Sequence, residues 1–249
     1  MLPYSKKYIL KFWIGLMDGD GSIQINHWKK KYLQYRLVIK LKYDLNNLFM
    51  LNIIHTILGG RVRIIYKNNN NIKIPIFVIW VVDSKEHFIK IINLLNQYKP
   101  KTERLLAQIH FAKSCLKHNN IDIYLKTRTD KYLLYQDNFL NKNNEDRSSN
   151  VDVFFNEWLS GFIEAEGCFC IRKNNSCSFS ISQKDDYFLI EKIKKHFLIQ
   201  SKIHKLKNNI YVLETYRKES LLKIIEHIDN YPLLGEKTIS FNKFKNKIK

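Results

Sequence analysis

Two stretches of this chain carry residue types that could do chemistry, and both follow one pattern. Residues 13–22 and residues 159–168 are apolar segments that end in two acids and a glycine. The pattern is typical of the last turns of a helix, with small residues four apart on one helix face. These small residues are Gly15 and Gly19 in the first copy and Gly161 and Ala165 in the second.

Two faces of small residues can pack at close range, so we expect the last acids of the two copies, Asp20 and Glu166, to lie side by side. Carboxylates at helix C-termini oppose the helix dipole by about 0.3–1 kcal/mol each, which a cation would offset. Mg²⁺ prefers hard oxygen ligands and keeps several waters, one of which could attack a phosphodiester. The spacing therefore predicts metal-dependent phosphodiester hydrolysis.

The composition indicates what would carry that phosphodiester. The 249 residues include 42 Lys and Arg against 23 Asp and Glu, a formal net charge of +19. This charge favours a polyanion, either nucleic acid or an acidic membrane surface, bound through counterion release. The longest apolar stretches, such as residues 76–82, have the length of a strand. We therefore expect no membrane-spanning segment. Because the paired acids favour phosphodiester chemistry, we expect nucleic acid and no membrane as the partner.

The elements around the motifs also repeat. After each motif the hydrophobic period changes from that of a helix to that of a strand, in residues 21–26 and 167–172. Each copy continues with a second strand, an amphipathic helix, a strand pair and another helix, which gives the order αββαββα twice. We therefore predict an α+β fold of two pseudo-symmetric repeats, residues 1–118 and 151–249, joined by an Asn-rich linker at residues 119–150.

With two motif copies that each open an αββαββα unit, the chain resembles a two-repeat LAGLIDADG homing endonuclease, the monomeric kind commonly encoded in organellar introns. The resemblance spans nearly all 249 residues. It implies that the motif helices join the two halves and that each antiparallel sheet forms a saddle in the DNA major groove. It also implies cleavage of one phosphodiester per strand at a long asymmetric target in double-stranded DNA, which promotes intron mobility.

The resemblance assigns the metal ligands. In the family the last acid of each motif binds a divalent metal, expected here to be Mg²⁺. These acids are Asp20 and Glu166, and the carbonyl groups of Gly19 and Ala165 would be additional ligands.

The resemblance also implies a basic and polar shell that positions water and neutralises charge near the scissile phosphates. The basic residue that follows the closing proline of each repeat is Lys237 in the second and Arg104 in the first. A glutamine at the end of the second strand falls on Gln183, for which the first repeat offers Lys42 or Tyr43. Together with the two acids, Lys237, Arg104 and Gln183 are the expected catalytic residues.

Polar side chains that alternate along the strands would form the DNA-reading faces. A strand of about ten residues at roughly 3.3 Å each covers about one turn of B-DNA, so two sheets would read about two turns. Amide side chains can hold adenine edges, and Arg and Lys can hold guanine or phosphate. The expected DNA-binding residues are Ser22, Gln24, Asn26, Arg36, Lys40, Lys42, Arg61, Arg63, Arg172, Ser178, Ser180, Ser182 and Lys184.

Two other functions stay open on the sequence. An RNA maturase would bind its own intron RNA through the same basic surface, alone or beside cleavage, and a noncleaving DNA-binding regulator would use the same scaffold. Both expected metal positions are acidic, which argues against a protein that acts only as a maturase. The two unequal halves predict a monomer. A composition rich in Lys, Ile and Asn is typical of AT-rich genes, and it favours an organellar protein, in the mitochondrion rather than the chloroplast.

Overall fold

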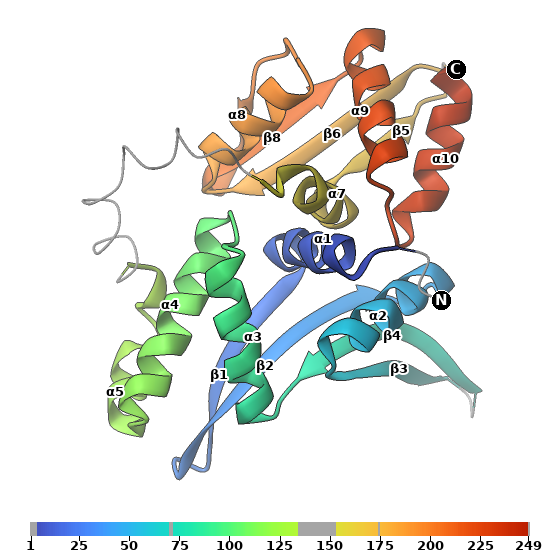
Figure 1. The fold of residues 1–249 in the computed structure, drawn as a ribbon. Helices are drawn as coiled ribbons and strands as arrows, with labels where there is room; N and C mark the ends of the chain where they lie inside the picture. Colours follow the sequence, from blue (N-terminus) through green and yellow to red (C-terminus); the bar gives the residue numbers. More distant parts are fainter. Residues whose placement is uncertain (1–3, 70–71, 134–152, 174, 249) are drawn as a thin grey trace.

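The computed structural model describes residues 4–69, 72–133, 153–173 and 175–248, which form two halves that meet at a pair of helices (Figure 1). The first half runs through α1 (Lys6–Gly19), β1 (Gly21–Trp28), β2 (Tyr32–Lys42), α2 (Leu45–Leu58), β3 (Arg61–Asn69), β4 (Ile72–Val82), α3 (Lys85–Gln97), α4 (Glu103–His118) and α5 (Ile121–Thr127). The second runs through α7 (Phe155–Glu166), β5 (Cys168–Ile171), β6 (Cys177–Lys184), α8 (Tyr187–His196), β7 (His204–Lys205), β8 (Ile210–Thr215), α9 (Lys218–Asn230) and α10 (Lys237–Ile248). The predicted order αββαββα is confirmed in both halves.

The expected linker is described only in its first part, because residues 134–150 lie outside the described residues. The described part holds α5, which the sequence pattern did not predict. Tyr124 of this helix is buried, and its hydroxyl donates a hydrogen bond to the carbonyl of Ile25 at 3.0 Å. This contact packs α5 against the first half.

Each half contains one four-stranded antiparallel sheet, with strand order β1-β2-β4-β3 in the first and β5-β6-β8-β7 in the second. In the first sheet, Ile23, Leu37 and Val82 are ladder neighbours on one face, and all three are buried. Helices α2 and α3 lie on that face, as α8, α9 and α10 do on one face of the second sheet (Figure 1). The opposite, helix-free face of each sheet carries the polar positions of the alternation.

The two sheets differ in size. Strand β2 has 11 residues, about 36 Å at 3.3 Å per residue, which matches one turn of B-DNA. In the second sheet β5 has 4 residues and β7 only 2, so the first strand of the strand pair that the sequence predicts in this half is very short. The reason is local, because Asn208 and Asn209 adopt positive φ in the turn that follows and end the strand there.

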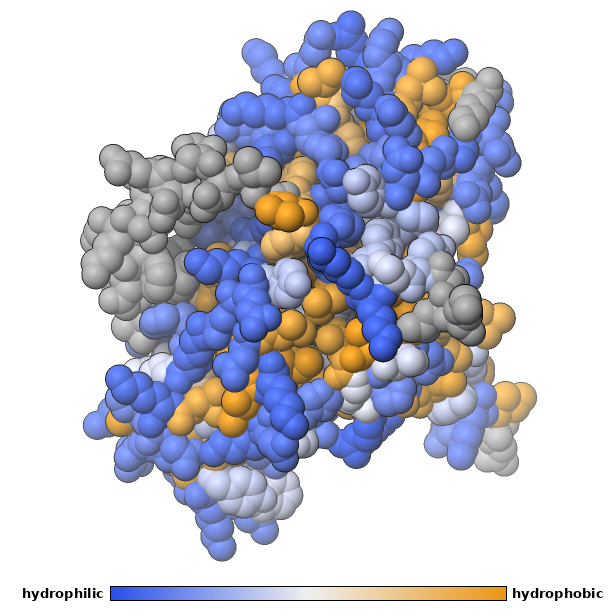
Figure 2. Space-filling model, in the orientation of Figure 1, coloured by the Kyte–Doolittle hydropathy of each residue, from blue (hydrophilic) through white to orange (hydrophobic). Residues whose placement is uncertain are grey.

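The surface on the helix side is largely hydrophilic, with hydrophobic residues showing between the helices of the lower half (Figure 2). In the described parts of the chain, none of the helices combines the length and the apolar character needed to traverse a bilayer.

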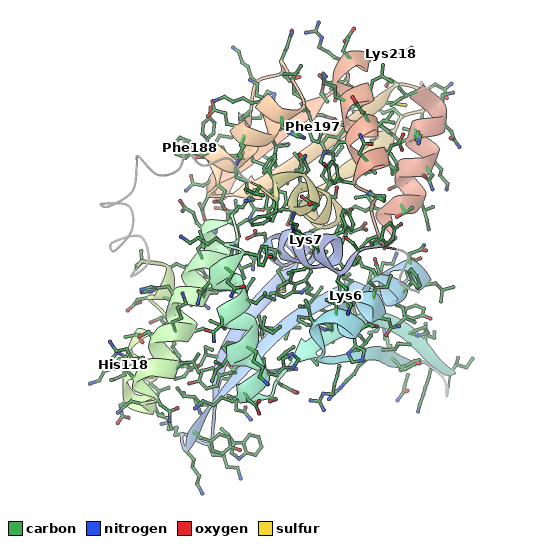
Figure 3. The ribbon with its side chains drawn as sticks, viewed as in Figure 1. Lys6, Lys7, His118, Phe188, Phe197 and Lys218 are labelled. Atoms are coloured by element: carbon green, nitrogen blue, oxygen red, sulfur yellow. The ribbon has the colours of Figure 1, made fainter. Side chains whose placement is uncertain are left out.

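A buried histidine, His227, contacts the second motif helix through Ser160. Phe197, labelled in the upper half of Figure 3, packs edge-on against the His227 ring at 5.4 Å between centroids. Ser160 donates its hydroxyl hydrogen to the Tyr231 carbonyl at 2.7 Å, so His227 Nε2 must donate to Ser160 Oγ at 3.1 Å. His196 Nε2 lies 3.3 Å from His227 Nδ1. Burial, and then the neighbouring His196, lower the pKa of His227 to about 3.

This histidine predicts an acid-dependent loss of stability. The folded state keeps His227 neutral, whereas the unfolded chain binds a proton near pH 6.5. Stability is therefore complete above that pH and falls as pH drops toward about 3, with a slope that approaches about 1.4 kcal/mol per pH unit. Urea unfolding of the native protein and of His227→Gln at pH 7, 6 and 5 measures this. The gap between the two proteins should narrow on acidification, and a constant gap would contradict the prediction.

Candidate active site

The two motif helices touch backbone to backbone. Helices α1 and α7 lie side by side at the centre of the molecule (Figure 1). A methyl group placed on Gly15 would lie 1.9 Å from the Trp158 carbonyl oxygen, and one on Gly161 would lie 1.8 Å from the Phe12 carbonyl oxygen. No side chain fits at either position. The small residues that the motif supplies are thus what allows the helices to approach this closely.

This contact brings the two helix C-termini together. A methyl group on Gly19 would lie 2.2 Å from Cβ of Ala165 and 3.4 Å from Glu166 Oε1. The Glu166 carboxylate therefore reaches across to the end of the first motif helix, where Asp20 is the C-terminal cap. The predicted neighbours Asp20 and Glu166 are placed at one site.

The two acids repel each other and lie close to two cations. Asp20 keeps solvent contact, yet desolvation by the surrounding helix ends raises the pKa of its carboxyl, against the lowering effects of Lys237 and Arg104. Partial burial raises the pKa of Glu166 as well, and the charge of Asp20 raises it further. Neither carboxylate accepts a hydrogen bond from any residue that the structure describes. The arrangement leaves negative charge that a bound cation would stabilise.

The two expected basic residues bind the ends of the motif helices. Arg104 donates to the carbonyl of Gly21 at 2.6 Å and to that of Gly19 at 2.9 Å. Lys237 Nζ donates to the carbonyl of Ala165 at 2.5 Å. Each cation thus caps a helix C-terminus, which is favourable for the helix dipole, and stands next to the paired acids.

The earlier acid of the first motif holds the segment that carries Arg104. Asp18 is fully buried and accepts hydrogen bonds from the backbone N–H groups of Lys101 and Thr102 at 2.8 and 3.0 Å. It also accepts one from Trp158 Nε1 of the other motif helix at 2.7 Å. Asp18 is therefore a positioning residue that ties both halves to the segment preceding Arg104.

Glu164 does the same in the second half. Its buried carboxylate accepts from the backbone N–H groups of Leu234, Gly235 and Lys237 at 3.2, 3.0 and 3.0 Å. Desolvation raises the pKa of this carboxyl, and the three N–H donors and the Lys237 charge oppose the rise. Glu164 thereby fixes the backbone of Lys237 next to the paired acids.

We expect Glu164→Gln to weaken both the fold and the chemistry. The amide NH₂ would face a backbone N–H, at a cost of about 1–3 kcal/mol, or a lower Tm by about 5 °C for a chain of this size. Displacement of Lys237 would also slow cleavage, because about 1 Å of misplacement can cost a hundredfold. Calorimetry and single-turnover cleavage below the Tm measure the two effects. Glu226→Gln on the exposed face of α9 is the matched control, and equal behaviour of both variants would refute the positioning role.

The donor set fits a hard divalent cation. Two carboxylates lie together, and the carbonyl oxygens of Gly19 and Ala165 belong to the same two helix ends. Each of these carbonyl groups already accepts a hydrogen bond, from Arg104 or from Lys237. Over the described residues, no group of three or more His, Cys, Asp or Glu side chains could hold a metal. Mg²⁺ commonly binds through one or two carboxylates and takes its other ligands from water and phosphate, so Asp20 and Glu166 suffice for it.

Gln183 and Arg104 line the same cleft. Gln183 is 8% exposed at the end of β6, and Lys184 also lines the cleft, which has a volume of about 320 Å³. The structure thus brings the expected glutamine to the basic residue of the other half.

The strand ladders fix the position that corresponds to Gln183 in the first half. Measured from the strand that follows each motif, Gln183 corresponds to Leu41, and Lys184 corresponds to Lys42. Neither Lys42 nor Tyr43, the two residues expected from the sequence, occupies the matching position. The glutamine position is therefore apolar in the first half.

Most of the expected DNA-binding residues lie on the helix-free faces of the two sheets. The residues on this face of the first sheet are Ser22, Gln24, Asn26, Arg36, Lys40, Lys42, Arg61 and Arg63. Those on the second are Ser178, Ser180, Ser182 and Lys184. Ser178 is only 2% exposed, so it has little surface to offer a ligand.

Arg172 follows the end of β5 and has partners that the sequence did not indicate. Its guanidinium lies 4.7 Å from the centroid of the Tyr216 ring and 3.3 Å from Glu214 Oε1. On the first sheet, Arg61 forms an ion pair with Asp83. These contacts restrict the side-chain conformations of Arg172 and Arg61 in the unbound protein.

Two contacts across the halves also had no sequence signal, because each partner belongs to the other repeat. Asp186 Oδ1 accepts from the backbone N–H of Glu103 at 3.0 Å. Asn47 Oδ1 accepts from the backbone N–H of Glu236 at 3.0 Å. Both contacts hold the residue that immediately precedes Arg104 or Lys237.

The sequence matches one family over both halves. Residues 13–115 and 159–248 match the family described as LAGLIDADG endonuclease. The chain is similar to a probable intron-encoded endonuclease aI3 of Dictyostelium citrinum, with 44% identity over 96% of this chain and 94% of that protein. A protein of the same name from Debaryomyces hansenii is 41% identical over 96% of this chain, which spans 38% of that longer protein.

Solved structures share the fold. The I-LtrWI LAGLIDADG homing endonuclease bound to target DNA has a TM-score of 0.72 at 20% identity, with 98% of this chain and 90% of that chain covered. The homing endonuclease I-GzeII in complex with its DNA target has a TM-score of 0.67 at 20% identity, with 95% and 88% covered.

Proposed function

Because the chain belongs to the LAGLIDADG endonuclease family, we propose that it is a homing endonuclease that cuts one long asymmetric sequence in double-stranded DNA, with one phosphodiester hydrolysed on each strand. The observation that carries the proposal is the pair of carboxylates, Asp20 and Glu166, which lie together at the ends of two packed helices and accept no hydrogen bond from the described part of the chain. The basic helix-free face of the first sheet supports DNA as the substrate.

The proposed cofactor is Mg²⁺, held by Asp20 and Glu166. Bound there, it would supply Lewis-acid stabilisation of the phosphodiester and a water of lowered pKa. Arg104 and Lys237 offset negative charge as the phosphates approach the two acids. Asp18 and Glu164 keep the side chains of Arg104 and Lys237 in place, because they accept hydrogen bonds from the backbone of the segments that carry these two residues.

The sheets would orient the DNA. Lys and Arg on the helix-free faces neutralise phosphates and set the register of the protein on the duplex, and polar side chains between them read base edges. Because the two sheets differ in strand length and in side chains, the two half-sites would differ, which supports an asymmetric target bound by a monomer.

The proposal extends to where the protein works. Relatives that are named intron-encoded endonucleases, together with the Lys-, Ile- and Asn-rich composition, support expression from an organellar intron, in the mitochondrion rather than the chloroplast.

A cleavage selection tests the function. Purified protein and Mg²⁺ are incubated with a randomised DNA library, with Asp20→Asn and Glu166→Gln as controls, and new ends are sequenced. We expect discrete double-strand ends from the native protein alone. Ends that the two variants also produce would point to a contaminating nuclease, and no ends at all would overturn the proposal.

An RNA maturase is the second candidate, because the intron-encoded RNA maturase bI4 of Saccharomyces cerevisiae is 31% identical over 100 residues, 37% of this chain and 14% of that protein. Tight binding and splicing of structured intron RNA by a protein that cuts no library member would favour this function instead.

A further inference from the structure

A group of three neighbouring apolar side chains stands beside Lys40 and Lys42 on the helix-free face of the first sheet, among the residues expected to hold DNA. Ladder pairing places Phe77 between Ile65 and Lys42. Two residues further along the same strand and on the same face, Ile79 lies next to Lys40. We refer to Ile65, Phe77 and Ile79 as the apolar strip.

The apolar strip is separate from the hydrophobic core. The core residues of the same strand, Val78 and Trp80, point to the opposite face and are fully buried. Ile65 is 36% exposed, and the other two members of the strip are partly exposed. Exposed apolar side chains in the middle of a basic face indicate that the surface is covered when the protein binds its ligand.

The charges around the apolar strip favour a nucleic-acid ligand. Lys40 and Lys42 flank the strip on β2, and Arg63 pairs with Ile79 from the other side. Lys40 Nζ lies 4.0 Å from the centroid of the Phe77 ring, so its stem covers part of the strip while its charge stays available to a phosphate. Cations on both sides of the strip would straddle a groove between two phosphate backbones.

The base edges in the major groove offer one apolar group, the C5-methyl of thymine. On the premise of the proposed DNA-binding function, we propose that the apolar strip reads thymine, by contact of Ile65, Phe77 and Ile79 with C5-methyl groups in the half-site bound by the first sheet. The strip is thus a specificity-determining surface that selects thymine over cytosine at these positions without a hydrogen bond to the base.

The second sheet carries a related surface with fewer cations. Val212 and Ile210 occupy the positions that match Ile79 and Phe77, and the Leu206 N–H donates to the Ile210 carbonyl at 2.7 Å. Lys184 lies next to Ile210, but the ladder neighbours of Val212 are Ser182 and His204 instead of two cations. Because cations flank the apolar residues on both sides in the first sheet, methyl recognition should be strongest in that half-site.

Deoxyuridine tests the proposal, because it differs from thymidine only by the missing C5-methyl. Each thymine of the selected target is replaced in turn, and the Kd is measured in EDTA so that cleavage does not interfere. At one to three thymines of one half-site, we expect affinity to fall about fourfold per methyl, the factor that corresponds to about 0.8 kcal/mol for burial of one such group. The penalty should disappear in Ile65→Ala or Ile79→Ala.

Val212→Ala is the matched control, and it should leave the penalty at these thymines unchanged. The proposal is overturned if no thymine shows a penalty, or if the penalty survives in both Ile65→Ala and Ile79→Ala. Cleavage of the unmodified target by the native protein is measured in parallel. If the native protein does not cleave this target, the proposed function is overturned. If it cleaves the target but no deoxyuridine substitution weakens binding, only the proposed role of the apolar strip is overturned.

Discussion

Replacing Asp20 with asparagine is expected to reduce DNA cleavage by at least about a thousandfold, because metal-assisted stabilisation of a transition state amounts to several kcal/mol. DNA affinity should change little, since the sheets that bind DNA are untouched. Glu166 reaches the end of the first motif helix, and Asp20 interacts electrostatically with Lys237 at the end of the second, so the two acids share one site. We therefore expect Asp20→Asn to stop cleavage of both strands, as measured with a target labelled on each strand.

The stability of the same variant provides its control. The pKa values of Asp20 and Glu166 are raised in the folded protein, so at neutral pH their ionised forms oppose folding. Removal of one charge should raise the Tm while activity is lost, a trade-off common at active sites. A lower Tm would mean that inactivation reflects damage to the fold. Rapid cleavage of one strand by Asp20→Asn would mean that the two acids act independently.

The sequence predicts the centre of the molecule better than its periphery. The meeting of Asp20 and Glu166 follows from a motif that occurs twice, with small residues four apart on each of the two helices. The placement of Arg104 and Lys237 follows from the resemblance to a known family. These predictions rest on a repeated motif, and they do not require the register of any strand pair.

Features set by strand register or by contacts outside the two motifs were not predictable. The match between Gln183 and Leu41 is set by strand pairing, which a shift of one residue would change. The contact of Asp186 with Glu103 needs the relative orientation of the two halves. The low exposure of Ser178 likewise depends on what packs over it, which alternation along a strand does not specify.

Gly161→Ala is expected to have the largest effect on stability. The added methyl would lie 1.8 Å from the carbonyl oxygen of Phe12, a backbone atom that cannot turn aside. Separating the helices costs more than the roughly 1 kcal/mol that alanine gains in helix propensity, and we expect a net loss of about 3 kcal/mol, or about 6–12 °C in Tm. Calorimetry measures this, with Asn52→Ala on the exposed side of α2 as the control.

The two motif glycines also predict a specific kind of coupling. Gly15 of α1 faces the backbone of α7, and Gly161 of α7 faces the backbone of α1, so one outward movement of the helices would relieve both clashes. The double variant should therefore lose clearly less stability than the two single losses added together, because contacting sites are not additive. Additive losses would mean that the two contacts yield separately. In either single variant that still folds, cleavage should fall further than DNA binding, because the separation that admits the methyl also moves Asp20 away from Glu166.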